Sequence, residues 1–133
     1  MLLALLRDAM SIKMPAQARA SSAASWWFIS GTPASSGKAE GLARVMTDPA
    51  EAELRQGEIL VTRYTDPAWT PLFFTAGALI TEVGGVLSHG AVVAREVGLP
   101  AIVGVTGATT CIRNGQRLRV NATEGTIELL EED

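Results

Sequence analysis

Short apolar runs, separated by glycine and proline, constrain the fold of this chain more than any other feature of its sequence. Several of these runs are four or five residues long and rich in β-branched residues, which is typical of buried strands. The runs that we interpret as strands are Leu42–Met46, Glu58–Thr62, Ala78–Thr81 and Ala101–Val105. Only 5% of the residues are aromatic, so the core must be built from valine, isoleucine, leucine and alanine.

Between these runs the sequence carries signals for loops and helices. Gly31–Gly41 contains so much glycine, serine and proline that we interpret it as an irregular loop. Two Asp-Pro pairs are typical of helix starts, and they predict short helices over Pro49–Arg55 and Pro67–Thr75. Pro71 lies inside the second helix, so that helix is either broken or begins later.

The end of the chain is predicted to be β-structure. Asn114-Gly115 lies between two short runs and favours a two-residue hairpin. Gln116–Asn121 alternates polar and apolar residues, so its two apolar side chains are expected to face the core, and Thr126–Leu130 forms a last strand. Together these elements predict a mixed α/β fold of short strands with about three helices.

The size and charge of the chain exclude several function classes. Its 133 residues suit one compact domain, and we expect that domain over residues 26–133, after a poorly ordered leader over residues 1–25. The net charge of −3 argues against a nucleic-acid partner. A single cysteine, Cys111, excludes an internal disulfide and a paired-cysteine metal site. We therefore expect a cytoplasmic protein that binds neither nucleic acid nor membrane.

One segment of the chain carries its only histidine in a distinctive setting. A predicted strand is followed by Gly84 and Gly85, which allow a sharp turn of the backbone. Ser88 is a good residue to precede a helix, and we predict a helix over His89–Val97 that ends at Gly98. His89 is thus expected in the first turn of a helix, directly after a glycine-rich loop.

The start of a helix is a natural site for an anion. Its first N–H groups have no partner within the helix, and they attract phosphate oxygens. An uncharged imidazole is also a nucleophile, so His89 could accept a phosphoryl group that the same N–H groups then hold. The residues alone leave other interpretations open: a histidine that is only structural, a hydrolase that pairs Ser88 with His89, and a metal site, for which one histidine and one cysteine offer few ligands.

The segment GGVLSHGAVVAREVGLPAIVG closely resembles the phosphohistidine motif of the phosphoenolpyruvate-utilising enzymes, nearest to the branch of phosphoenolpyruvate synthase and rifampicin phosphotransferase. GTPASSGKAEGLARV, ILVTRYTDPAWTPLF and NGQRLRVNATEGTIELL resemble further parts of the same domain. The resemblance covers residues 29–130. It implies a swivelling β/β/α phosphohistidine domain that carries a phosphoryl group between two active sites.

The resemblance also implies roles for individual residues. His89 matches the phosphorylated histidine, and Ser88, Gly90, Gly84, Gly85 and Arg95 match positions around the phosphoryl group. Arg95 could equally be a solvated or structural residue. Leu87 departs from the family, because many relatives have a threonine there that is a regulatory phosphorylation site in plant dikinases; we therefore expect no such regulation here.

The family phosphorylates this histidine with separate domains, which a chain of this length cannot also contain. The resemblance implies an ATP-grasp nucleotide-binding domain and an acceptor-binding domain on other chains, with ATP and Mg²⁺ on a partner and no cofactor on this chain. We therefore expect a phosphotransferase component that turns over nothing alone. The acceptor is pyruvate, phosphoenolpyruvate or a small-molecule hydroxyl. The alternative is a non-catalytic remnant or protein-interaction module with the same fold, and a small esterase that uses Ser88 is a third interpretation.

Overall fold

The structure is a computed structural model, and it describes residues 25–51 and 53–130. In this part of the chain eight strands form one sheet in the order β1-β8-β7-β3-β4-β5-β6-β2. The strands are β1 (Ser25–Ser30), β2 (Thr32–Ser35), β3 (Lys38–Val45), β4 (Ile59–Thr62), β5 (Ala78–Thr81), β6 (Ala101–Val103), β7 (Arg117–Asn121) and β8 (Thr126–Leu130). The helices are the 3₁₀-helix η2 (Pro67–Trp69) and the α-helices α3 (Thr70–Phe73), α4 (His89–Val97) and α5 (Ala108–Cys111). The mixed α/β fold with short strands is confirmed.

The long strand β3 joins an antiparallel part of this sheet to a parallel part. Its first residues, 38–42, pair antiparallel with β7, whereas residues 43–45 pair parallel with β4. Gly41 lies at the change, where a Cβ atom would come within 2.6 Å of the carbonyl oxygen of Gly57. The β1, β8 and β7 side is antiparallel, and β4, β5 and β6 are parallel, with β2 antiparallel on the outer edge.

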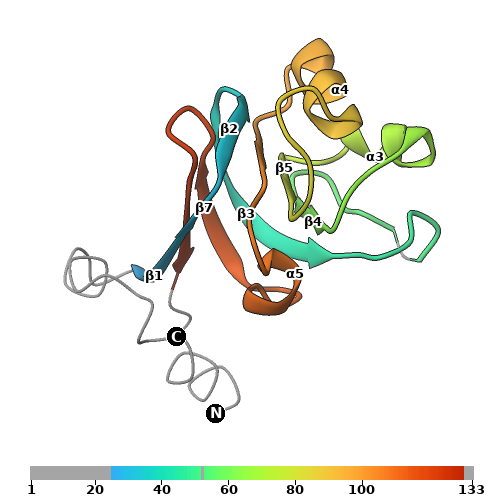
Figure 1. The fold of residues 1–133 in the computed structure, drawn as a ribbon. Coiled ribbons are helices and arrows are strands. Elements are labelled where there is room, and N and C mark those ends of the chain that lie inside the picture. Colours follow the sequence, from blue (N-terminus) through green and yellow to red (C-terminus); the bar gives the residue numbers. More distant parts are fainter. Residues whose placement is uncertain (1–24, 52, 131–133) are drawn as a thin grey trace.

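The parallel strands lie between two layers. Helices α3 and α4 cover one face, and β1 and β7 lie on the other side (Figure 1). All four residues of β4 and of β5 are buried, as expected of parallel strands covered on both faces. Their side chains alternate between the two layers, so Ile59 and Ile80 face the antiparallel strands while Leu60 and Leu79 face the helices.

The buried side chains accordingly form two clusters. The sheet-side cluster lies between the antiparallel and parallel strands, and the helix-side cluster lies under α3 and α4. The sheet-side cluster consists of Trp27, Ala43, Ile59, Val61, Ala78, Ile80, Ile102, Val105, Ala108, Ile112, Leu118, Val120, Ala122, Ile127 and Leu129. The helix-side cluster consists of Ala34, Met46, Leu54, Leu60, Trp69, Phe73, Leu79, Ala91, Ala94, Leu99, Ala101 and Val103.

The irregular loop expected over Gly31–Gly41 is wrong. Much of this segment is strand, because β2 pairs antiparallel with β6 and the first half of β3 pairs with β7. Pro33 fits within β2 because this strand lies at the edge of the sheet, where a missing N–H costs no ladder bond. The partners of β2 and of the first half of β3 lie more than sixty residues away, so local composition did not indicate these pairings.

The helix expected over Pro49–Arg55 is also wrong. Asp48 Oδ1 accepts a hydrogen bond from Ala50 N at 2.9 Å, and Glu51 N bonds to Asp48 O at 3.0 Å. The Glu51 carboxylate accepts from Thr47 N at 2.8 Å and from Asp48 N at 3.2 Å. These bonds close a single turn. The same Asp-Pro signal is correct for the second helix, which is broken into η2 and α3 between Trp69 and Thr70, with Pro71 in the first turn of α3.

The Asn114-Gly115 turn forms, but it is not the hairpin that we expected. It lies between helix α5 and β7, so the element before it is a helix and not the strand that a hairpin needs. Asn114 Oδ1 accepts a hydrogen bond from Val45 N at 2.7 Å, so the turn is fixed to the end of β3. The expected alternation in the following strand is confirmed, since Leu118 and Val120 are buried.

The leader expected over residues 1–25 lies, except for Ser25, outside the described residues. The first described element, β1, begins at Ser25 and contains the expected boundary at residue 26, which stays a prediction. No helix in residues 25–51 and 53–130 has the length and apolar character needed to cross a bilayer.

Candidate functional site: the start of helix α4

The candidate site lies at the carboxyl edge of two parallel strands. Strand β5 ends at Thr81, the chain crosses a loop over residues 82–88, and α4 begins at His89. Strand β4, the parallel neighbour of β5, ends at Thr62 and leads to Thr65. Because the carboxyl ends of neighbouring parallel strands lie at one edge, the two segments meet there. This edge is where α/β sheets ordinarily bind ligands.

Thr65 holds the His89 ring. Its hydroxyl Oγ1 lies 2.9 Å from Nδ1 of His89, within hydrogen-bond distance. Thr65 is buried, with 9% of its surface exposed, and the Phe73 ring centroid lies 6.1 Å from that of His89. The ring is therefore oriented by a fixed hydroxyl and a buried aromatic neighbour. With Nδ1 engaged by Thr65, Nε2 is the nitrogen left for attack.

The start of α4 leaves its first N–H groups available. Ser88 has the extended conformation of a residue that precedes a helix (φ −68°, ψ 162°), but its side chain does not cap the helix. Instead its hydroxyl donates to the Gly85 carbonyl at 2.7 Å, and its own N–H donates to the same oxygen at 3.0 Å. The N–H groups of the first turn thus keep the positive end of the helix open to an anion.

Glycine at position 90 lets α4 approach the sheet closely. A Cβ atom there would lie 2.9 Å from Thr65 Oγ1 and 3.2 Å from Leu79 Cδ2. A larger residue would therefore displace the hydroxyl that holds His89. In the preceding loop, Gly84 has a φ of +120°, which side chains rarely adopt, and this allows the chain to turn back toward α4.

Arg95 does not lie beside His89. It is six residues further along α4, about 9 Å along the helix axis at the usual rise. Its Nη1 donates to the Ala34 carbonyl at 3.0 Å and its Nη2 to the Val86 carbonyl at 2.7 Å. A contact between Arg95 and a phosphoryl group stays a prediction, whereas its two main-chain partners are part of the structure.

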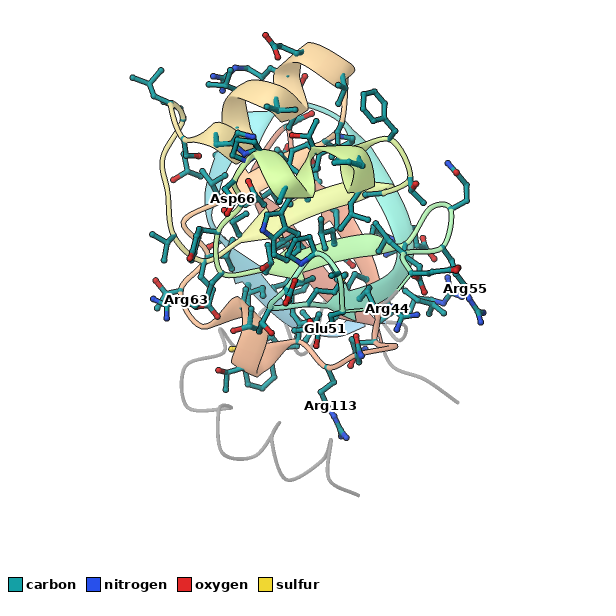
Figure 2. All side chains as sticks on the ribbon, turned by 90° about the vertical axis from the view of Figure 1, so that its right-hand side faces the viewer. Arg44, Glu51, Arg55, Arg63, Asp66 and Arg113 are labelled. Carbon is teal, nitrogen blue, oxygen red and sulfur yellow. The ribbon has the colours of Figure 1, made fainter. Side chains whose placement is uncertain are left out.

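Figure 2 labels four other arginines. Asp66 is the labelled residue closest to α4, and Arg44, Arg55, Arg63 and Arg113 all lie farther from that helix in this view. The donors that the structure places at the start of α4 are the uncapped main-chain N–H groups of its first turn. Within residues 25–51 and 53–130 no three side chains of histidine, cysteine, aspartate or glutamate are grouped as metal ligands.

The geometry disfavours a hydrolase that uses Ser88. The Ser88 hydroxyl donates to a carbonyl, and the His89 ring is bonded to Thr65 at Nδ1. Within the part of the chain that the structure describes, Ser88 therefore has no base that could activate it.

Sequence reasoning did not find Thr65. The available signal was the position of Thr65 just after a buried strand, at the edge where the strand before His89 also ends. Of the aromatic residues that follow Thr65, Trp69 and Phe73 are buried, whereas Phe74 is 67% exposed.

Comparison with known proteins identifies the family of the chain. The family model described as "PEP-utilising enzyme, mobile domain" matches residues 54–125, more than half of the chain. The chain belongs to this family of mobile, phosphoryl-carrying domains.

The relatives are long proteins of which this chain matches a small part. A rifampicin phosphotransferase from Streptomyces sviceus is 60% identical over 100 residues, which cover 75% of this chain and 12% of that protein. A probable phosphoenolpyruvate synthase from Staphylothermus marinus is 44% identical over 103 residues, covering 75% and 12% respectively. A solution structure of Enzyme I has a TM-score of 0.51 and 28% identity, and the match covers 61% of this chain and 33% of that one.

Proposed function

We propose that this chain is a phosphoryl carrier and that His89 accepts and releases the phosphoryl group. The observation that carries the proposal is the coincidence of a nucleophile and an anion site. Thr65 engages Nδ1 of His89 at 2.9 Å, and the open N–H groups of the first turn of α4 lie at the same helix end. The match to the mobile-domain family supports the same role.

In the proposed reaction the phosphoryl group passes through Nε2. With the ring proton on Nδ1 and donated to Thr65 Oγ1, the Nε2 lone pair attacks the phosphorus atom of a donor. A nitrogen–phosphorus bond forms, and the phosphorus–oxygen bond to the leaving group breaks, with its electron pair leaving on oxygen. In the second step an acceptor oxygen attacks phosphorus, and the electron pair of the nitrogen–phosphorus bond returns to Nε2.

Both steps need partner domains that supply the donor and the acceptor. We propose a nucleotide-binding domain of the ATP-grasp type, which holds ATP and Mg²⁺, and a separate acceptor domain, in a cytoplasmic assembly. The match spans only 12% of each of these two relatives, which leaves room in those proteins for such domains. Of the acceptor classes, a small-molecule hydroxyl is the first to test, because the relative at 60% identity is named a phosphotransferase of rifampicin.

The test is the intact mass of the full chain, measured at neutral to alkaline pH after incubation with extract of the native host. ATP or phosphoenolpyruvate is added in separate reactions, and the extract must phosphorylate a known carrier. We expect an acid-labile gain of one phosphoryl group on the chain and none on His89→Ala. That variant should fold and lose only about 1 kcal/mol of stability, the usual contribution of its one side-chain hydrogen bond. No gain with either donor would contradict the carrier function, and a large loss of stability would indicate a structural histidine.

A further inference from the structure

The loop that precedes His89 is firmly held at its beginning. Glu82 N donates to the Thr62 carbonyl at 3.1 Å, and Val83 N donates to the Arg63 carbonyl at 2.9 Å. The Glu82 carboxylate accepts from the Thr109 N–H at 2.7 Å and also from the Thr109 hydroxyl. Residues 82 and 83 are therefore fixed to the segment after β4 and to helix α5.

Residues 84–87 have far fewer contacts. Within the loop, the Gly85 carbonyl accepts both bonds from Ser88. Val86 and Leu87 expose 46% and 85% of their surface, so side-chain burial does little to hold this part. Across the described ranges, the bond from Arg95 Nη2 to the Val86 carbonyl is the one hydrogen bond that reaches residues 84–87 from beyond Ser88.

The same guanidinium also reaches the sheet. Arg95 Nη1 donates to the carbonyl of Ala34, a buried residue of the edge strand β2. A guanidinium presents several N–H donors in a rigid plane, so one side chain can hold two carbonyls at a fixed separation. Arg95 forms no ion pair with a carboxylate among the described residues. Its donors are thus directed to the loop and to β2.

We infer that Arg95 is a positioning residue, which fixes the loop over residues 84–87 to strand β2 and thereby holds His89 and the first N–H groups of α4 in place for phosphoryl transfer. This inference rests on the proposed function. In this inference Arg95 acts by holding the loop in place and does not contact the phosphoryl group. A loose loop would let Ser88 and the start of the helix shift, and small displacements of reacting groups reduce rates strongly.

Two variants distinguish the effect of the two guanidinium hydrogen bonds from the effect of the positive charge. Arg95→Met removes both hydrogen bonds, and we expect the initial rate of His89 phosphorylation to fall by about ten- to a hundred-fold. Arg95→Lys keeps the charge but has no planar fork, so its rate should lie between those of Arg95→Met and the wild type. A lysine variant at the full wild-type rate would overturn the inference, because charge alone would then suffice.

A control variant accounts for lost stability. Val120→Ala removes buried methyl groups in β7, far from the loop in the sheet order, and should lower the unfolding midpoint. We expect this variant to accept phosphate at the wild-type rate under conditions where it is folded. An equal loss of rate in Val120→Ala and Arg95→Met would overturn the inference, since general destabilisation would explain both.

A second measurement uses the unphosphorylated full chain, so its result does not depend on the proposed function. Hydrogen exchange of the amides of residues 84–89 and the NMR signals of the His89 ring are compared among the same variants. We expect faster exchange and shifted ring signals in Arg95→Met, and neither change in Val120→Ala. Unchanged exchange in Arg95→Met would overturn the inference even if phosphorylation fails. A wild-type chain that accepts no phosphate would contradict the proposed function alone.

Discussion

At the scale of single residues, the proposed chemistry of His89 depends on neighbours that are distant in sequence. Thr65 lies 24 residues before it, and its hydroxyl engages Nδ1. Gly90, the next residue, provides the space that this hydroxyl occupies. The histidine is therefore held in one orientation by a buried polar contact, and Nε2 remains for attack. This contact can be removed without changing the size of the side chain at position 65.

We predict that Thr65→Val lowers the rate of His89 phosphorylation by about ten-fold, because the ring loses the contact that orients it. The free energy of unfolding should fall by about 1 kcal/mol, the usual contribution of one such hydrogen bond. Chemical denaturation and the initial rate of mass gain measure the two effects. Thr65→Ser keeps the hydroxyl and serves as the control, with a rate near that of the wild type. A wild-type rate in Thr65→Val would contradict the orienting role.

At the scale of elements, local residues predicted where α4 begins and ends, but they did not predict which of its residues are buried. Its bounds, His89–Val97, agree with the sequence prediction, and Gly98 ends it in the left-handed conformation (φ +77°, ψ 25°). Its buried residues are Gly90, Ala91 and Ala94. Val97, by contrast, is 37% exposed. Small residues are buried here because the helix lies close to the sheet.

We predict that Gly98→Ala destabilises the domain by about 1 kcal/mol, because a side chain strains a left-handed residue. No atom lies within 4 Å of a Cβ at position 98, so the effect would come from the backbone alone. Gly85→Ala is the matched control, since Gly85 also has open space around its Cβ and its φ is not positive. Denaturant unfolding should place Gly85→Ala near the wild type. Equal effects of both substitutions would argue against the conformational explanation.

At the scale of the whole molecule, the two core clusters share the parallel strands. The side chains of β4 and β5 alternate between the clusters, so loss of either layer exposes one face of the same strands. Each cluster contains one buried tryptophan: Trp27 lies in the sheet-side cluster and Trp69 in the helix-side cluster. Each layer therefore contains its own fluorescent reporter.

We predict that both layers unfold in one cooperative transition. In a Trp26→Phe background, Trp69→Phe leaves Trp27 as the reporter and Trp27→Phe leaves Trp69. Within each variant, fluorescence and far-ultraviolet circular dichroism should give the same denaturation midpoint. A Trp69 signal that changes before the circular dichroism would indicate that the helix layer separates from the sheet.

The sequence by itself determined the elements whose signals are local. Strand β5 needed only a run of apolar residues, and α4 needed only Ser88 at its start and Gly98 at its end. These elements placed His89 at a helix start after a glycine loop, and the motif around it identified the family. Such features depend on backbone preferences and caps within a few residues, which can be read along the chain.

The tertiary structure alone decided the contacts between distant segments. Strand β2 pairs with β6, and the first half of β3 pairs with β7, each across more than sixty residues. Thr65 and Arg95 acquired their partners across 24 and 61 residues. Hydrogen bonds of this kind form only when the fold brings the groups together, so they cannot be predicted from composition and spacing.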